Sequence, residues 1–189
     1  MAWLSSNELN EMGFASIGSN VLISNKASLY NCANISIGNN VRIDDFCVLS
    51  AGIGGIFLLD YIHIAVYSSL IGAGKITLLD FCGLASRVSI YSSNDDYSGA
   101  KMTNPTVPSL FSGVTHADVT LEKHVIVGTG SVILPGVTLH EGVAVGALSL
   151  VNKNCKAFGI YAGTPAKLIG NRTRDLLDIE KELMRYFKR

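Results

Sequence analysis

The segment "VTLEKHVIVGTGSVILPGVTLHEGVAVGALSLV", residues 119–151, carries an aliphatic residue at every sixth position. This series consists of Leu121, Val127, Ile133, Leu139, Val145 and Val151. Two positions before each stands a second small or apolar residue: Val119, Val125, Ser131, Val137, Val143 and Ser149. A period of six fits neither an amphipathic helix nor the simple alternation of a long strand. It predicts an all-β fold, a triangular parallel β-helix with three short strands in each coil.

The first part of the chain repeats this design less strictly. Four similar stretches recur every twenty or twenty-one residues: "IGSNV" (17–21), "IGNNV" (37–41), "LLDYI" (58–62) and "LLDFC" (78–82). Within these coils the six-residue series continues at Ile37, Ile43 and Leu49, at Leu58, Ile64 and Leu70, and at Leu78, Leu84 and Ile90. We expect about six or more coils over 15–155, interrupted once by a loop at about 92–118.

Both ends of the chain depart from the repeat. Residues 1–14 predict a short helix, capped by Ser6 and ending near Gly13, that covers the first coil. Residues 156–189 predict an extension and a C-terminal helix that packs against the last coil or a neighbouring subunit. The apolar face of that helix consists of Leu176, Ile179, Leu183 and Phe187. We expect residues 1–189 to form a single domain.

Composition excludes several classes of partner. Fifteen Lys and Arg residues balance fifteen Asp and Glu residues, so there is no basic excess to bind nucleic acid. Four cysteines lie far apart and without zinc-ligand spacing: Cys32, Cys47, Cys82 and Cys155. This predicts free thiols, with neither a metal site nor disulfides.

The apolar stretch 51–74 is long enough to span a bilayer. However, Asp60 and His63 lie in its middle, where a charge is costly, and its glycines suit a helix poorly. The first residues show no signal-peptide pattern. We therefore expect a cytoplasmic protein that does not enter the membrane.

The unbroken repeat, followed by "GVTLHEGVAVGALSLVNK" and then by "YAGTPAKLI" at 161–169, resembles the hexapeptide-repeat acyltransferases. This resemblance implies a left-handed β-helix, a homotrimer, and acyl-CoA bound between adjacent subunits. The stretches "IYSSNDDYSG", "TNPTVP" and "LEKHVIVGTGSVILPGV" look most like the branch that acylates sugars for surface polysaccharides such as lipopolysaccharide. That branch includes enzymes acting on dTDP-linked amino-deoxy sugars.

The resemblance also implies how CoA is held. Backbone groups around Thr129 and Ala147 would contact the pantetheine arm, and small side chains there would let it approach closely. Lys153 and Lys167 would lie near the CoA phosphates, with Pro165 beside the adenine. Two cations suit a polyanionic ligand. We expect acetyl-CoA or a longer acyl-CoA as co-substrate, and no metal.

The loop opens on "YSSNDDYSG" (91–99) and contains no histidine before His116. Many O-acetyltransferases of this family carry a histidine there that takes a proton from a hydroxyl. A carboxylate is too weak a base for a sugar hydroxyl, but it can accept the proton of an attacking amine. Asp95 is therefore predicted as the proton acceptor, with Asp96 tuning it or shaping the loop. Because neighbours on an extended chain point in opposite directions, only one should enter the site.

Alternatives remain at this stage. The "NDD" stretch could instead form an Asx turn with solvated carboxylates. His116 or His124 could serve as the base, and Ser93, Asn94 and Tyr97 are expected to contact the acceptor.

The sequence thus favours an acyl-CoA-dependent N-acyltransferase acting on a nucleotide-linked amino sugar. Direct attack in a ternary complex is preferred, since no nucleophile motif is present. O-acetylation of a sugar hydroxyl is the alternative reaction. A non-catalytic trimeric scaffold is the alternative from another class, but it would not need the polar loop or Lys153 and Lys167.

Overall fold

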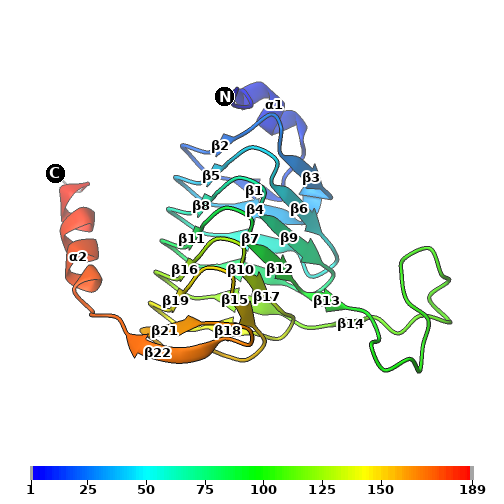
Figure 1. The fold of residues 1–189 in the computed structure, drawn as a ribbon. Helices are drawn as coiled ribbons and strands as arrows, with labels where there is room; N and C mark the ends of the chain where they lie inside the picture. The colour runs from blue at the N-terminus through cyan, green and yellow to red at the C-terminus, as the bar shows by residue number, and fades with distance from the viewer. Residues whose placement is uncertain (1, 188–189) are drawn as a thin grey trace.

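The computed structural model describes residues 2–187. Three sheets surround one axis and form a triangular β-helix. The first sheet contains β1 (Ser16–Ile17), β4 (Ile35–Ile37), β7 (Ile56–Leu58), β10 (Ile76–Leu78), β15 (Val119–Leu121) and β18 (Thr138–Leu139). The second contains β2 (Leu22–Ile23), β5 (Arg42–Ile43), β8 (His63–Ile64), β11 (Gly83–Leu84), β16 (Ile126–Val127), β19 (Ala144–Val145), β21 (Gly159–Ala162) and β22 (Lys167–Asn171). The third contains β3 (Ser28–Tyr30), β6 (Val48–Ala51), β9 (Ser69–Gly72), β12 (Ser89–Tyr91), β17 (Val132–Ile133) and β20 (Leu150–Val151). Figure 1 shows the coils stacked from the N-terminal end downward.

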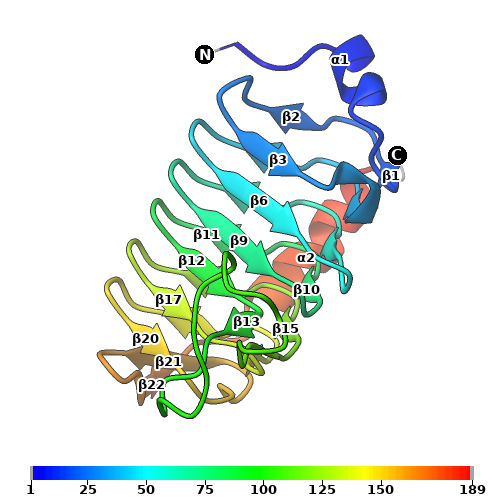
Figure 2. The same cartoon turned by 90° about the vertical axis from the view of Figure 1, so that its right-hand side faces the viewer.

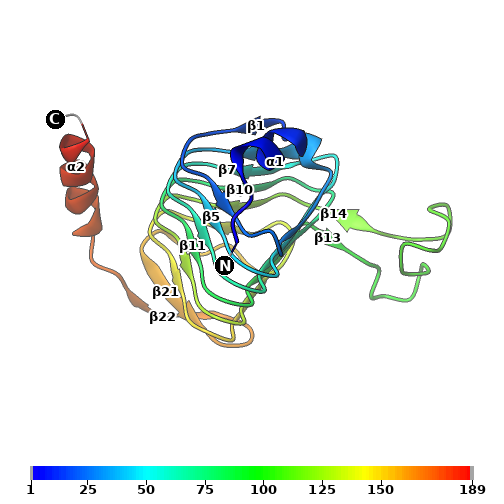
Figure 3. The same ribbon diagram turned by 90° about the horizontal axis from the view of Figure 1, so that it is seen from above.

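The helix is left-handed, as the family resemblance predicts. Viewed from the N-terminal end, the chain passes from the first sheet to the second and then the third in a counter-clockwise sense as it recedes (Figure 3). The strands of the coils pair in parallel, and within the three sheets of the stack β22 alone runs antiparallel, against β21. The second sheet therefore counts seven parallel strands, one for each turn.

The predicted core is confirmed. Every inward position of residues 119–151 is buried, including the hydroxyls of Ser131 and Ser149. Both hydroxyls donate to the carbonyl of Gly146, at 3.0 and 2.7 Å, so neither is left without a partner. The aliphatic positions of the upstream coils are buried as well. The six-residue period therefore identified the side chains that fill the interior.

The loop leaves the stack at one corner without disturbing it. Between β12 and β15, the chain forms an antiparallel pair, β13 (Ser93–Asn94) with β14 (Thr115–His116), which leads out to the rest of the loop (Figure 1). Strand β15 then pairs with β10, joining Leu78 to Leu121 in unbroken register. The excursion is therefore an insertion between two ordinary coils.

The other two corners need left-handed backbone, and non-glycine residues supply much of it. The corner between the first and second sheets, called the first corner, has positive φ at Asn20, Asn40, Tyr61, Phe81 and His124. The corner between the second and third sheets, called the second corner, has positive φ at Phe46, Tyr67, Arg87 and Leu148. This conformation costs roughly 1–2 kcal/mol for each such residue. Ring stacking along the corners offsets part of that cost.

Helix α1 (Ser6–Glu11) covers the N-terminal end of the stack (Figure 2). The predicted cap at Ser6 is wrong by one residue, because Ser5 is the N-cap. The Ser5 hydroxyl accepts from the Glu8 N–H, and the Glu8 carboxylate accepts from the Ser5 N–H at 2.7 Å. Only the serine three positions before Glu8 can form this reciprocal capping box. Leu9 is buried beneath the helix and joins the core.

Helix α2 (Leu176–Tyr186) does not pack against the last coil, contrary to one of the two expectations. Strand β22 lies beside β21 there and occupies the edge that the helix would cover. The helix instead runs back alongside the coils (Figure 1). Glu180 contacts Lys123 and His124, and the ring of Phe187 lies 6.4 Å from that of Tyr61.

The remaining expectations concern the apolar stretch and the cysteines. Residues 51–74 pass through four short strands, β6 to β9, and no helix among residues 2–187 is long and apolar enough to cross a membrane. All four cysteines are free, as predicted. Burial raises the thiol pKa of Cys82 to about 12, and that of Cys47 to about 11, so these are packed, unreactive side chains.

Candidate active site

The start of the loop forms one wall of a cleft. Its volume is about 410 Å³, and its lining residues are Tyr91, Ser93, Asn94, Asp95, Tyr97, Val132 and Leu134. Strand β12 and the β13–β14 pair place Ser93, Asn94 and Asp95 here, and β17 supplies the apolar floor. The structure therefore brings together four residues that the sequence singled out. It adds Tyr91, Val132 and Leu134, which are outward-facing members of ordinary repeat units and carry no distinguishing sequence signal.

Asp95 and Asp96 have different surroundings. The Asp95 side chain is exposed and lines the cleft. The Asp96 carboxylate accepts hydrogen bonds from the N–H of Ser98 at 2.9 Å, from the hydroxyl of Ser98 at 2.6 Å, and from the N–H of Lys101 at 2.7 Å. These bonds, led by the Ser98 hydroxyl, lower the pKa of Asp96. A carboxylate stabilised in its charged form is a poor proton acceptor, so Asp96 is placed to shape the loop.

His116 also stands at the mouth of the loop. Its Nδ1 lies 2.8 Å from the hydroxyl of Ser93, which already accepts the N–H of Ala73 at 2.7 Å. The Ser93 hydroxyl thus links the His116 ring to the backbone of the coil before the loop. The antiparallel pairing of Ser93 with His116 holds the two side chains side by side.

The other histidines lie away from the loop. His124 is at the first corner, stacked on Phe81, with its Nε2 2.7 Å from Glu180. His63 is paired with Asp44 at 2.9 Å, and His140 with Glu122 at 3.1 Å. Within one chain, therefore, the structure does not bring His124 to the cleft that Asp95 lines.

A second hollow lies on the outer face of the second sheet. It measures about 360 Å³ and is lined by His63, Ala65, Gly83, Leu84, Ala85, Ser86, Ile126 and Thr129. Ala147 is exposed one coil below Thr129, beside Leu148, whose N–H donates to the Thr129 carbonyl at 2.8 Å. The small side chains leave backbone accessible along this face, as a pantetheine arm would require. We call this hollow, with Ala147, the Thr129 groove.

Three further residues predicted for CoA lie at the C-terminal end of the stack. Lys153 follows β20, Lys167 begins β22, and Pro165 follows a cis peptide bond between them. All three are exposed. Neither lysine has a carboxylate within 4.0 Å among residues 2–187, so both charges are available to a phosphate.

The loop cleft and the Thr129 groove share no lining residue. The cleft lies beside the third sheet, whereas the groove lies on the second. The structure thus places the residues predicted for the acceptor and those predicted for pantetheine on separate faces of one chain.

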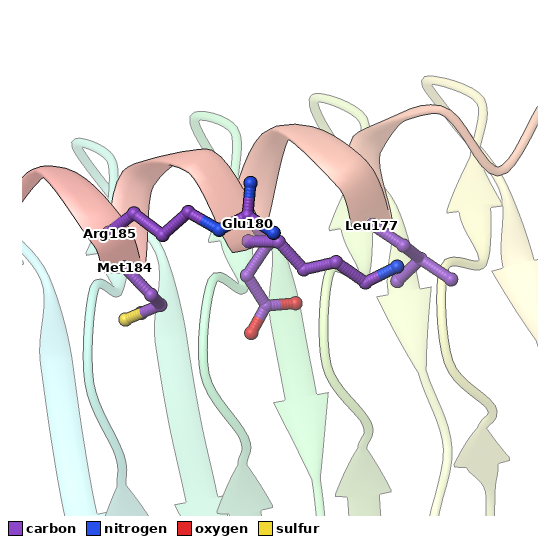
Figure 4. Close-up of a pocket in the computed structure, with 5 residues that line it drawn as sticks. Leu177, Glu180, Met184 and Arg185 are labelled. Atoms are coloured by element: carbon purple, nitrogen blue, oxygen red, sulfur yellow. The ribbon is translucent and has the colours of Figure 1, made fainter.

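Another hollow, of about 530 Å³, follows α2 and is lined by Leu177, Glu180, Lys181, Met184 and Arg185 (Figure 4). All five lining residues belong to the helix itself. Its one carboxylate, Glu180, is already held by Lys123 and His124, at 2.7 Å each. This hollow therefore offers no free group for acyl transfer.

A left-handed β-helix with a groove of small side chains, two unneutralised lysines at its C-terminal end and a carboxylate-bearing loop defines a hexapeptide-repeat acyltransferase. No family model matches the chain. Over 180 residues it is 59% identical to the dTDP-4-amino-4,6-dideoxy-D-glucose acyltransferase of Escherichia coli, covering 95% of this chain and 94% of that protein.

Solved structures agree. AntD, an N-acyltransferase from Bacillus cereus, in complex with dTDP and 3-hydroxybutyryl-CoA, matches with a TM-score of 0.93 and 44% identity over 99% of this chain and 98% of that one. A variant of AntD in which one serine is replaced by alanine, in complex with dTDP-4-amino-4,6-dideoxyglucose and coenzyme A, also matches. Its TM-score is 0.94 and its identity 45%, covering 98% of each chain. The chain belongs to the dTDP-amino-sugar N-acyltransferases of the hexapeptide-repeat family, which confirms the resemblance found in the sequence.

Proposed function

We propose that this protein transfers an acyl group from acyl-CoA to the 4-amine of dTDP-4-amino-4,6-dideoxyglucose. The observation that carries the proposal is the 59% identity, over nearly the whole length of both chains, to an acyltransferase named for that sugar. The AntD structures hold dTDP or the amino sugar together with coenzyme A or its 3-hydroxybutyryl ester. They support acyl-CoA as the donor, as the sequence predicts.

In the proposed reaction the neutral amine attacks the thioester carbon. A C–N bond forms and the C–S bond breaks. The amine loses one proton, which passes through Asp95 to the leaving sulfur, so that CoA departs as its thiol. Asp95 accepts that proton, because its carboxylate lines the cleft and has no hydrogen bond to the loop that would hold it. Ser93, Asn94 and Tyr97 line the same cleft and orient the sugar. Asp96 positions the loop.

CoA lies along the Thr129 groove, with Lys153 and Lys167 at its phosphates and Pro165 at its adenine. The small side chains of the groove support this placement for pantetheine. Within residues 2–187 no cluster of His, Cys, Asp or Glu could hold a metal ion. The roles given to these residues need only hydrogen bonds and charge.

The active site is proposed to form between subunits of a homotrimer. The loop cleft and the Thr129 groove lie on different faces, so the loop of one subunit would meet the groove of the next. We further propose that residues 1–189 form a single acyltransferase domain, with coils over 15–155. We propose a cytoplasmic location, where acyl-CoA and nucleotide sugars are made, and a role in building surface polysaccharides.

The test is thiol release from acetyl-CoA with dTDP-4-amino-4,6-dideoxyglucose and with its 4-hydroxyl counterpart. Turnover is expected on the amine alone, and Asp95→Asn should lower kcat by about 10²–10⁴-fold. His116→Ala is the matched variant on the same β-pair and should lower kcat far less. Turnover on the hydroxyl sugar that survives Asp95→Asn and fails with His116→Ala would instead establish an O-acetyltransferase.

A further inference from the structure

One glycine on the outer face of the second sheet has no structural requirement among residues 2–187. Gly83 lies in β11, and its φ is outside the left-handed region that favours glycine. A Cβ built on it would meet no atom within 4 Å beyond its two neighbours in the chain. Glycine weakens a strand and often marks a place where a ligand or another backbone approaches closely. Gly83 therefore leaves an open space in the sheet, which we call the Gly83 notch.

Two glycines in the following coils are different. A Cβ at Gly128 would lie 2.5 Å from the backbone nitrogen of Ala147, and one at Gly146 would lie 3.0 Å from the Cβ of Ala162. Close packing of successive coils therefore explains these two glycines. Of the three, only Gly83 opens on free space.

The strand register defines the walls of the notch. Gly83 pairs with His63 on β8 and with Ile126 on β16, so these two outward side chains flank the notch along the stack (Figure 1). Ile126 is 50% exposed and supplies an aliphatic wall. All three residues line the same hollow as Thr129. The notch is therefore part of the Thr129 groove.

The wall formed by His63 is held in place. Its Nε2 lies 2.9 Å from the carboxylate of Asp44, which also accepts a hydrogen bond from the Nε of Arg42 at 2.7 Å. The Asp44 side chain is only 7% exposed. A ring held by a buried carboxylate with two partners keeps its position. The width of the notch is therefore set by the fold.

Charge and polarity limit what can enter the notch. The lining of the hollow is mostly small or aliphatic, and its only ionisable side chain is that of His63. It offers no lysine or arginine for a phosphate, and the polar residues predicted for the sugar lie in the loop cleft instead. A small aliphatic group therefore suits the notch best.

We propose that the Gly83 notch receives the acyl chain of the donor, and that Gly83 sets the largest chain that the enzyme accepts. The inference rests on the proposed function, in which pantetheine lies in the Thr129 groove. Because the acyl group is bonded to the pantetheine sulfur, it lies in that hollow or beside it, whichever way the CoA runs. A butyryl group has as many carbons beyond its carbonyl as a valine side chain has beyond Cα. It is the size that we expect to fill the notch.

Calorimetry tests the notch without the acceptor. CoA, acetyl-CoA and butyryl-CoA are titrated separately into wild type, Gly83→Ala and Gly83→Val. Burial of the additional carbons should make butyryl-CoA bind to wild type about tenfold more tightly than CoA. Gly83→Val should remove this advantage and leave the Kd for CoA unchanged, with Gly83→Ala between the two. Thr77→Val, at an outward position of the same coil on the first sheet, is the matched control.

Turnover of the amino sugar with acetyl-CoA and with butyryl-CoA is measured on the same variants. Gly83→Val should lower kcat/KM for butyryl-CoA about tenfold to a hundredfold more than for acetyl-CoA. Equal losses for both donors, or a wild type that binds butyryl-CoA no more tightly than CoA, would overturn the inference.

Two further outcomes separate the notch from its surroundings. If Gly83→Val alters the mass of the assembly, Gly83→Ala decides: a variant of wild-type mass with an unchanged preference between the donors assigns the notch to a subunit contact and overturns the acyl site. An active wild type whose donor preference neither substitution changes sinks only the acyl site. Tighter binding of butyryl-CoA that depends on Gly83, without turnover of the amino sugar, sinks only the proposed reaction.

Discussion

At the residue scale, Asp96 holds the loop together. Both its oxygens accept hydrogen bonds from Ser98 or Lys101, and these bonds lower its pKa. We predict that Asp96→Asn loosens the loop, because an amide keeps only one acceptor oxygen. The KM for the amino sugar should rise, with a smaller fall in kcat than Asp95→Asn gives. Steady-state kinetics of the two variants, side by side, make the comparison; equal losses of kcat would contradict separate roles.

The pH dependence of that loop has a definite sign. A group whose folded pKa is lowered contributes stability above its unfolded pKa and loses it as the pH falls through the folded value. The Asp96 contribution is therefore present above about pH 3.8 and lost below it. Hydrogen exchange of the Ser98 and Lys101 amides should quicken, relative to the intrinsic rate, only under acid conditions.

The roles of the two aspartates could be predicted from the sequence only in part. The adjacency of Asp95 and Asp96 already implied that one faces the site and the other does not. The choice depends on which backbone amides the loop turns toward each carboxylate, and that is set by the fold of residues 96–101. The same limit applies to His124, whose neighbour in the sequence, Val125, is inward. His124 contacts Glu180, which lies far along the chain, and no sequence pattern connects these two residues.

At the element scale, α2 is attached by a small number of contacts. Its residues include none that are buried, and Glu180 accepts from both Lys123 and His124 at 2.7 Å. We predict that Glu180→Gln detaches the helix, because the amide cannot balance these donors. Hydrogen exchange should speed up across Leu176–Tyr186 while the unfolding temperature of the coils stays constant. Glu182→Gln, an exposed position on the same helix, is the control.

The same contact has a pH window. Burial alone would raise the pKa of Glu180, but the hydrogen bonds from Lys123 and His124 outweigh it and lower the pKa. The hydrogen bond to Glu180 raises the pKa of Lys123. The contact should therefore persist between about pH 4.5 and pH 10.5 and weaken beyond either limit. Helix protection that remained unchanged at pH 3 would contradict this assignment.

Elements were predictable where a short period governs them and less so where distant segments meet. The coils follow from side chains six residues apart, so a local pattern is enough. The helical face of α2 was also visible, as Leu176, Ile179 and Leu183 recur at helical spacing. Its docking site was not, because β22 occupies the last edge and the antiparallel turn that places it there has no repeat signal.

At the scale of the whole molecule, the separation of the loop cleft from the Thr129 groove has the strongest consequence. Asp95 belongs to the loop cleft and Thr129 to a groove on another sheet. The sequence could not show this separation. The order of residues along the chain is equally compatible with one active site that contains both Asp95 and Thr129. The aromatic corners escaped prediction for a similar reason: their rings are twenty or more residues apart, and only the coil register stacks them.

If each active site takes its loop from one subunit and its groove from the next, two inactive variants should complement each other. Asp95→Asn removes the proton acceptor, and Ala147→Trp fills the groove. In randomly mixed closed assemblies, about a quarter of the sites would combine a normal loop with a normal groove. Co-expression should therefore restore about that fraction of wild-type turnover, measured as thiol release. Two tagged copies of Asp95→Asn provide the baseline. A mixture no more active than this baseline would place the complete site within one chain.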